Sequence, residues 1–472
     1  MDETAMIDLP MHELSALVQD GEISPVESVA AALARIEATN PSIGAFSHVC
    51  AQRALEEARI QEKGLLAGVQ PGPLAGVPFG VKDLEHVAGL PTSHGSAAFV
   101  GRVATEDSVQ VARLRAAGAI VVGKTNTSEF GCTAYTKNLP FGVTRNPWNL
   151  ERTPGGSSGG SGAAIAARMV PMATAADGGG SIRIPACYVG AFGMKPSFGR
   201  VPTGDSAMNM LRWADTLHYG PLTRSIRDAA LMLDVTAGPH PSDPNSLPPP
   251  GVSYSDAIDE PLRKLRIAFS KDLGYARVDA DVLREVHAGV EVFRSLGHAV
   301  DEIDTVFPDI GRAWAYLAGS ETYAELAPAV EGREHLLGRG FWQGTLATAQ
   351  LTMAAMGDIA RERWELNRIL EEVFDRYDLL LTPTLPTEAF GAAGPFPRVV
   401  GGEPVESPLA AVAFTYPFNM SGHPAATVRA GMTDGALPAG LQIVAQRHRD
   451  DLVLQAAAAY DAVRPMDCWP TL

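Results

Sequence analysis

The chain has 472 residues, of which 46% are hydrophobic and 19% charged, a composition typical of a globular protein long enough to bury a large core. Its formal net charge of −16 disfavours nucleic acid or an anionic membrane as a partner, because both attract a basic face. The N-terminus lacks the cations of a secretory signal, no stretch supplies about 18 uninterrupted apolar residues, and the four cysteines form no C-x-x-C pair, so we expect a cytoplasmic chain with reduced thiols.

The pattern of apolar residues predicts strands alternating with helices. Residues Met11–Ile36 read as two helices, because the break at Asp20–Pro25 supplies a glycine and then Ser24 as an N-cap. The alternation along the rest of the chain predicts an α/β domain with a mixed sheet. The further predicted helices are 51–61, 107–117, 163–168, 225–235, 282–296, several within 310–374, and 452–463, and the predicted strands are 74–84, 119–122, 170–175, 265–269, 299–303, 379–381, 425–428 and 441–444.

No polar linker clearly divides the chain. The best candidate, the Pro-rich stretch Gly238–Gly251, equally suits a loop inside one sheet. We therefore expect one domain over residues 1–472, with an N-terminal helical segment of about residues 1–65 packed on it.

One motif is a formal match without the right context. Gly118–Thr125 satisfies the phosphate-loop pattern G-x-x-x-x-G-K-[ST], but its four central residues are strand formers. The following residues, Asn126–Phe130, read as a loop or short helix and not as the long helix that a phosphate loop feeds. ATP binding is not predicted.

The stretch Arg152–Pro185 holds two glycine and serine clusters. The first, Gly155–Gly162, runs into strong helix formers, which weakens its interpretation as a flexible linker. The second, Gly178–Ser181, follows a strand-like segment, and three glycines allow a turn that aims several N–H groups at one point. An oxyanion hole needs such a turn, and Ser181 lies where a nucleophile would be needed.

A nucleophilic Ser181 needs a base. His94, His218 and His423 lie in no motif suited to that role, and the nucleophile-elbow pattern at residues 155–159 is not preceded by a strand. A neutral lysine is the alternative, since burial can lower a lysine pKa from about 10.4 to roughly 7–8. Lys82, at the end of an apolar strand, is the candidate, and the Ser157 hydroxyl is available to relay the proton.

At these residues the chain resembles the amidase signature family of serine hydrolases. The family's fold implies a mixed, twisted central β-sheet covered by α-helices on both sides. The spacing of 24 residues between Ser157 and Ser181 also matches the family. The resemblance covers nearly the whole chain, through residues 80–83 (GVKD), 118–130 (GAIVVGKTNTSEF), 146–148 (NPW), 155–160, 177–185 (DGGGSIRIP), 378–383 and 435–444 (GALPAGLQIV).

The resemblance implies a role for each site residue. Ser181 would attack the carbonyl carbon, Ser157 would relay the proton, and Lys82 would be the base. The peptide bond that precedes Ser157 would be cis. The backbone N–H groups of Gly178, Gly179, Gly180 and Ser181 would bind the oxyanion, with Asp177, Ser158 and Arg183 as supports. No metal and no organic cofactor is implied.

The residues around Asp177 narrow the resemblance. Ala176 and Gly178 stand where threonine is frequent, and the resulting ADGGGS resembles the branch that hydrolyses aryl acylamides, cyclic amide oligomers and urethanes. We therefore expect a small-molecule substrate, a bulky uncharged amide with ester or carbamate activity beside it, and a monomer or homodimer. The alternative is the glutaminase subunit of a tRNA-dependent amidotransferase, but its arginine-rich segment has no clear equivalent between Gly332 and Thr352. A non-catalytic binding member is disfavoured, because the implied lysine and both serines are present.

Variable loops are expected to form the substrate pocket. The best candidates are residues 128–137, 203–219 and 310–345. The side chains expected to supply apolar surface there are Met208, Met210, Trp213, Trp314, Tyr316, Phe341 and Trp342.

Overall fold

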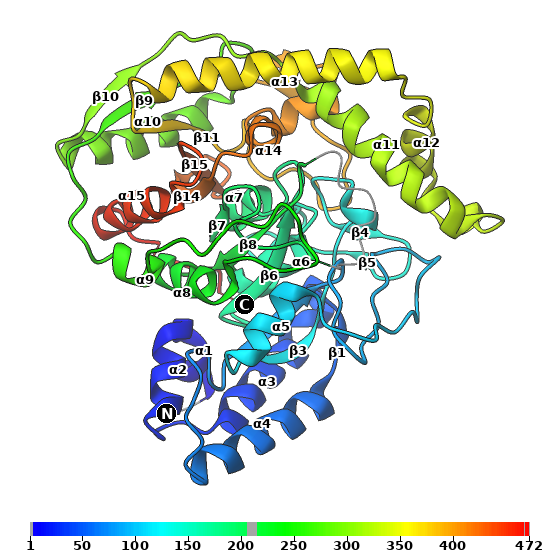
Figure 1. Ribbon diagram of the computed structural model, residues 1–472, viewed down its shortest axis with the longest axis vertical. Coiled ribbons are helices and arrows are strands. Elements are labelled where there is room, and N and C mark those ends of the chain that lie inside the picture. The colour runs from blue at the N-terminus through cyan, green and yellow to red at the C-terminus, as the bar shows by residue number, and fades with distance from the viewer. Residues whose placement is uncertain (1–2, 205–214, 467, 472) are drawn as a thin grey trace.

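A computed structural model describes residues 3–204, 215–466 and 468–471, and a mixed sheet of eleven strands runs through it (Figure 1). The sheet is parallel where β2 pairs with β3 and β6, and where β9 pairs with β10 and β11; the other pairings are antiparallel. From edge to edge the strands are β1 (Phe46–Val49), β3 (Ile120–Thr125), β2 (Pro78–Lys82), β6 (Met172–Asp177), β8 (His218–Thr223), β7 (Phe192–Lys195), β14 (Ala425–Met432), β15 (Pro438–Ala445), β11 (Leu379–Pro383), β9 (Arg266–Phe269) and β10 (Ala299–Glu302). Two short ribbons, β4 (Lys137–Asn138) with β5 (Gly142–Val143) and β12 (Val399–Val400) with β13 (Glu403–Pro404), lie outside this sheet.

Helices cover both faces of the sheet, as the family resemblance implied. In β11, Leu379 and Leu381 belong to an apolar cluster that includes residues of α8, α10 and α15, whereas Leu380, on the opposite face, belongs to a cluster that includes residues of α7, α11, α13 and α14. The helices are α1 (Glu3–Asp8), α2 (Met11–Gln19), α3 (Pro25–Ile43), α4 (Ala51–Leu66), α5 (Val109–Ala116), α6 (Gly159–Ala166), α7 (Arg183–Val189), α8 (Ile226–Thr236), α9 (Tyr254–Ala257), α10 (Ala280–Ser295), α11 (Gly311–Val330), α12 (Arg339–Ala347), α13 (Met353–Phe374), α14 (Tyr416–Ser421) and α15 (Asp450–Val463), with 3₁₀ turns at Glu129–Gly131, Glu334–Leu336 and Pro408–Val412.

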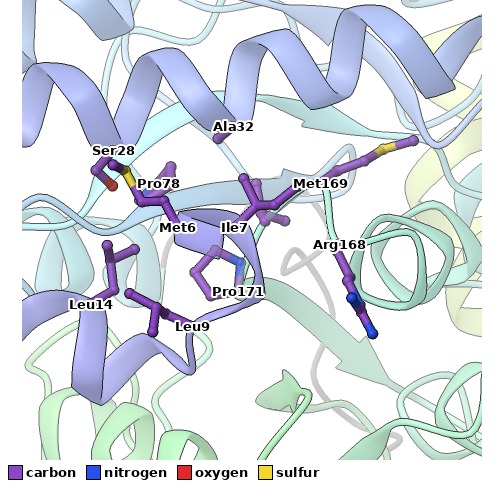
Figure 2. Close-up of a pocket in the computed structure, with 11 residues that line it drawn as sticks. Met6, Ile7, Leu9, Leu14, Ser28, Ala32, Pro78, Arg168, Met169 and Pro171 are labelled. Carbon is purple, nitrogen blue, oxygen red and sulfur yellow. The ribbon is translucent and has the colours of Figure 1, made fainter. Parts of the chain in front are cut away.

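The N-terminal helices form as the sequence predicts. Ser24 caps α3 by accepting the Val26 N–H at 2.9 Å, and Glu27 completes a capping box. The helix then runs to Ile43, beyond the predicted end, and stops at Gly44 with φ 68°. A small, mainly apolar pocket lies where α1, α2 and α3 meet the segment after α6 (Figure 2). Pro78, at the end of β2 opposite to Lys82, is one of its lining residues.

The first glycine and serine cluster folds differently from the prediction. Helix α6 begins at Gly159, inside the cluster, and not at Ala163. The physical reason is close packing: a Cβ on Gly160 would lie 2.4 Å from the backbone of Asn126, and one on Gly159 would lie 2.2 Å from the Thr136 hydroxyl. These glycines let a helix touch its neighbours, so tertiary contact overrides their low helix propensity.

The phosphate-loop match and the Pro-rich stretch are both packed into the fold. Lys124 lies inside β3 with a buried side chain, and its Nζ is 3.2 Å from Asp83 Oδ1, which leaves it pointing into the protein. The Pro-rich stretch begins against α5, because the Arg113 guanidinium donates to the carbonyls of Gly238 (3.1 Å) and Pro239 (2.7 Å).

Among the described residues, no helix combines the length and apolarity needed to cross a bilayer.

Candidate active site

Lys82 and Ser157 form a buried pair at the end of β2. Strand β2 lies between β3 and β6, so its last side chain is enclosed, and Lys82 is 0% exposed. Its Nζ donates to Ser157 Oγ at 2.8 Å and to the Ala176 carbonyl at 3.3 Å. The Ser158 hydroxyl donates to the same carbonyl at 3.4 Å. The three predicted residues Lys82, Ser157 and Ser158 therefore meet at the C-terminal end of β6, around the Ala176 carbonyl.

Burial lowers the pKa of Lys82 and so favours its neutral form. It lowers the pKa of Lys82 to about 7, against the opposing pull of the Glu85 and Asp177 carboxylates. A lysine with that pKa is substantially neutral near pH 7, so its nitrogen has a lone pair to accept a proton. The geometry thus supplies a hydroxyl and a base in hydrogen-bond contact.

The Ser157 peptide is held from several sides. The Gly156–Ser157 bond is cis, as the family resemblance implied. Thr127 Oγ1 donates to the Ser157 carbonyl at 3.0 Å, and a Cβ on Gly156 would lie 2.5 Å from the Thr133 carbonyl oxygen. The residue that contacts Lys82 is therefore fixed by backbone packing.

Asp177 organises the second glycine cluster from inside. Its carboxylate accepts the Gly180 N–H at 2.6 Å and two Arg183 hydrogen bonds at 3.0 Å each. Burial alone would raise the pKa of Asp177, but the Arg183 charge and hydrogen bonds from Arg183 and Asn419 hold it well below its usual range. Asp177 and Arg183 are both fully buried, so this ion pair locks the strand, the turn and α7 together.

Two residues that the sequence did not single out complete this network. Asn419 Nδ2 donates to Asp177 Oδ1 at 2.7 Å, and Gln442 Oε1 accepts from Arg183 at 2.8 Å. Gln442 lies within the GALPAGLQIV segment, which carried the resemblance as a block. No local signal marks Asn419.

The carbonyl side of the turn has its own partners. Trp314 Nε1 donates to the Gly178 carbonyl at 2.7 Å, and Thr415 Oγ1 donates to the Gly179 carbonyl at 2.6 Å. The N–H of Gly180 is already used by Asp177, which corrects the prediction that it is a free oxyanion donor. The N–H groups of Gly178, Gly179 and Ser181 have no acceptor among the described residues. Ser181 itself is half-buried at the end of the turn.

In the part of the chain that the structure describes, the three histidines considered as bases do not contact these serines through hydrogen bonds. His94, His218 and His423 are buried, and burial lowers the pKa of His94 to about 3. Within the described chain, none of the three hydrogen-bonds to Ser157 or Ser181. The described residues also hold no group of three or more His, Cys, Asp or Glu side chains placed to bind a metal ion.

Of the predicted pocket residues, Trp314 bonds to the turn after β6, and Tyr316 lies on α11 beneath the Arg312 guanidinium. The other five divide into two groups. Met208, Met210 and Trp213 lie outside the described residues. Phe341 stacks on Phe130, with ring centroids 5.2 Å apart, and Trp342 stacks on Tyr323 at 6.2 Å. Phe341 and Trp342 thus pack α12 against the 3₁₀ turn at Glu129–Gly131 and against α11, while their contact with a substrate stays a prediction.

Comparison with known proteins places this geometry in a family. The amidase family model matches residues 27–454. The chain is 36% identical to an acylamidase of Rhodococcus erythropolis, over 98% of this chain and 97% of the relative. It is also 36% identical to the A-type subunit of the glutamyl-tRNA(Gln) amidotransferase of Thermus thermophilus, over 95% of this chain and 96% of the relative.

Solved structures of amidases have the same fold as this chain. A bacterial aryl acylamidase of the amidase signature family superposes with a TM-score of 0.92 at 31% identity, covering 97% of this chain and 96% of its own. A 6-aminohexanoate cyclic dimer hydrolase, solved with its substrate, superposes with a TM-score of 0.88 at 31% identity, covering 98% and 99%. The chain therefore belongs to the amidase signature family and is an amidase, an enzyme that hydrolyses amide bonds.

Proposed function

We propose that this amidase works through an acyl-enzyme on Ser181, with Ser157 as proton relay and Lys82 as base. The observation that carries the proposal is the 2.8 Å contact between Lys82 Nζ and Ser157 Oγ in a fully buried setting. A buried lysine with a pKa of about 7 can take a proton at neutral pH, which an ordinary surface lysine cannot.

The steps follow from the proton path. Ser181 Oγ attacks the amide carbon, its proton passes to Ser157, and the Ser157 proton passes to Lys82. The oxyanion takes hydrogen bonds from the turn, with Gly179 and Ser181 as the principal donors. The C–N bond then breaks as the lysine's proton returns through Ser157 to the leaving nitrogen. Water, deprotonated along the same path, then attacks the acyl group on Ser181. The ester bond to Ser181 Oγ breaks, the carboxylic acid is released, and Oγ regains its proton.

We further propose bulky, uncharged amides as the substrates, with ester and carbamate (urethane) hydrolysis as side activities. The support is the ADGGGS sequence and the likeness to an acylamidase and to a cyclic-dimer hydrolase. No described atom lies within 4 Å of a Cβ built on Gly178, so this position leaves room next to the turn.

A fluorophosphonate probe tests the nucleophile. It should label Ser181 in the purified chain, and Ser181→Ala should abolish both labelling and amide turnover. Lys82→Ala should lose acylation while keeping the fold. Retained turnover in Ser181→Ala would refute the assignment.

A substrate panel tests the specificity. Anilides, carbamates, lactams and acetamide should separate bulky from small acyl and amine parts, and turnover of acetamide alone would refute the proposal. The sequence likeness to an amidotransferase component makes glutamine the remaining candidate. Ammonia release from glutamine, together with copurifying partner proteins, would favour that second function.

A further inference from the structure

We propose that Trp314, on α11, is a positioning residue for the oxyanion: its indole N–H holds and polarises the Gly178–Gly179 peptide, so that the Gly179 N–H faces the reacting carbonyl. This inference rests on the proposed acyl-enzyme mechanism. It adds a distant helix to the oxyanion site, because Trp314 lies 136 residues beyond Gly178 in the chain.

The direction of the hydrogen bond carries the argument. Trp314 Nε1 donates to the Gly178 carbonyl at 2.7 Å, and the cis peptides of the described chain lie elsewhere, at Gly156–Ser157 and Gly394–Pro395. In a trans peptide the C=O and the following N–H point in opposite directions. The Gly179 N–H therefore points away from the indole. It has no acceptor among the described residues, which leaves it available to a substrate.

The indole also fixes the turn by contact. A Cβ on Gly179 would lie 2.2 Å from Trp314 Cζ2, so the ring lies directly against the Gly179 backbone. The ring in turn stacks on Tyr416, with centroids 5.9 Å apart and planes 16° apart, and the Tyr416 hydroxyl donates to Asp309 Oδ1 at 2.9 Å. Asp309 also accepts the Gly311 N–H at the start of α11, at 3.1 Å. Helix α11 and the turn are therefore held in one arrangement.

The neighbouring peptide shows why Trp314 differs from Thr415. Thr415 Oγ1 donates to the Gly179 carbonyl at 2.6 Å, but the N–H of that same peptide belongs to Gly180 and is bound to Asp177 at 2.6 Å. Both ends of the Gly179–Gly180 peptide are thus used inside the protein. The Gly178–Gly179 peptide, backed by Trp314, instead combines an anchored carbonyl with an N–H that lacks an acceptor in the described chain. The Asp177–Gly178 and Gly180–Ser181 peptides share this combination, because Asn419 Nδ2 donates to the Asp177 carbonyl at 2.8 Å and the Ile184 N–H donates to the Gly180 carbonyl at 2.7 Å. Trp314 is the donor among these three that comes from α11. An amide whose carbonyl accepts a hydrogen bond is the stronger N–H donor, because hydrogen bonds in a chain polarise one another.

The test replaces Trp314 by phenylalanine, which keeps an aromatic ring against Gly179 and Tyr416 but removes the donor. The matched control is Trp148→Phe, because Trp148 Nε1 donates to the Val189 carbonyl at 2.8 Å without contacting the turn. Each variant is assayed for kcat and KM on an anilide. It is also assayed for inhibition by a trifluoromethyl ketone, which forms an oxyanion on a serine nucleophile, and by a non-reactive substrate analogue.

We expect Trp314→Phe to lower kcat about tenfold with little change in KM, less than the 10²–10³ lost with a direct donor. The inhibition constant of the ketone should weaken by a similar factor, while that of the unreactive analogue and all values for Trp148→Phe should stay near those of the parent. Unchanged kcat and ketone affinity in Trp314→Phe would overturn the inference. So would an equal loss for the ketone and the unreactive analogue, since that marks a pocket wall. Failure of the proposed mechanism would appear in a different variant, as amide turnover that is retained in Ser181→Ala.

Discussion

The role proposed for Lys82 requires the activity to depend on pH in a defined direction. The neutral amine is the form that accepts the proton, and burial lowers its pKa to about 7. We therefore predict that kcat/KM on an uncharged anilide rises as the pH increases through about 7 and then levels. The pH–rate profile of the purified chain measures this. An acidic limb near 10, the usual range of a lysine, would contradict the assignment of Lys82 as a buried base.

Glu85 sets part of that pKa. It is fully buried, burial raises its pKa to about 7, and its Oε1 has no hydrogen-bond partner among the described residues. Its anion favours the charged lysine, so Glu85→Gln should lower the Lys82 pKa and move the acidic limb of kcat/KM to lower pH by roughly one pH unit.

Glu57→Gln is the control for this variant. Glu57 is a half-buried carboxylate on α4 that pairs with Arg53 and Arg115, and it is not among the groups that act on Lys82. Its pH profile should match the parent. A Glu85→Gln profile that also matches the parent would show that Glu85 does not act on the lysine.

At the scale of an element, the turn after β6 depends on one ion pair. Asp177→Asn keeps the shape of the side chain but leaves the Arg183 charge buried without its counter-ion. Removing one partner of a buried pair costs about 3–5 kcal/mol, so we predict a lower Tm and loss of Ser181 labelling. Asp259→Asn, which breaks the exposed contact with Arg227, should leave Tm and labelling unchanged. A parental Tm in Asp177→Asn would contradict the role given to the pair.

The three glycines of the turn are not equivalent. A methyl group on Gly178 would meet no described atom within 4 Å, whereas one on Gly179 would meet the Trp314 ring at 2.2 Å. We predict that Gly178→Ala keeps the parental Tm and raises KM most for the bulkiest amides. Gly179→Ala should instead lower kcat for every substrate, because the ring or the turn must move. Thermal unfolding and kinetics over an amide series measure both, and equal effects of the two variants would refute this interpretation.

Local chemistry made some of these elements predictable and left others hidden. Ser24 and Pro25 marked the start of α3, and an apolar strand ending in Lys82 marked a lysine that is buried in the structure. Helix α7 and strand β7 escaped the pattern, because they are short and buried on every side. The partners of the turn escaped it for a different reason. Thr415 and Asn419 were not singled out, and Trp314 was expected only as apolar pocket surface and not as a hydrogen-bond donor to the turn. All three act through contacts with residues more than 100 positions away in the chain, and no periodicity records such contacts.

At the scale of the whole molecule, the two halves of the chain share one sheet. Strand β7 pairs with β14, and Arg183 bonds to Gln442, a residue 259 positions further on. We infer one domain over residues 1–472 that unfolds as a unit, because separating the halves would expose a long sheet edge and the buried Arg183 charge.

Cleavage inside the Pro-rich stretch tests this inference. Residues Pro248 and Pro249 are exposed, so a protease site inserted there can be cut in the folded protein. We predict that the two pieces elute together in size-exclusion chromatography, keep Ser181 labelling and unfold in a single calorimetric transition. The same insertion left uncut is the control. Separate elution, or two transitions in the cut protein, would show that the sheet edge between β7 and β14 is a boundary between independent domains, because each half would then retain its fold without the other.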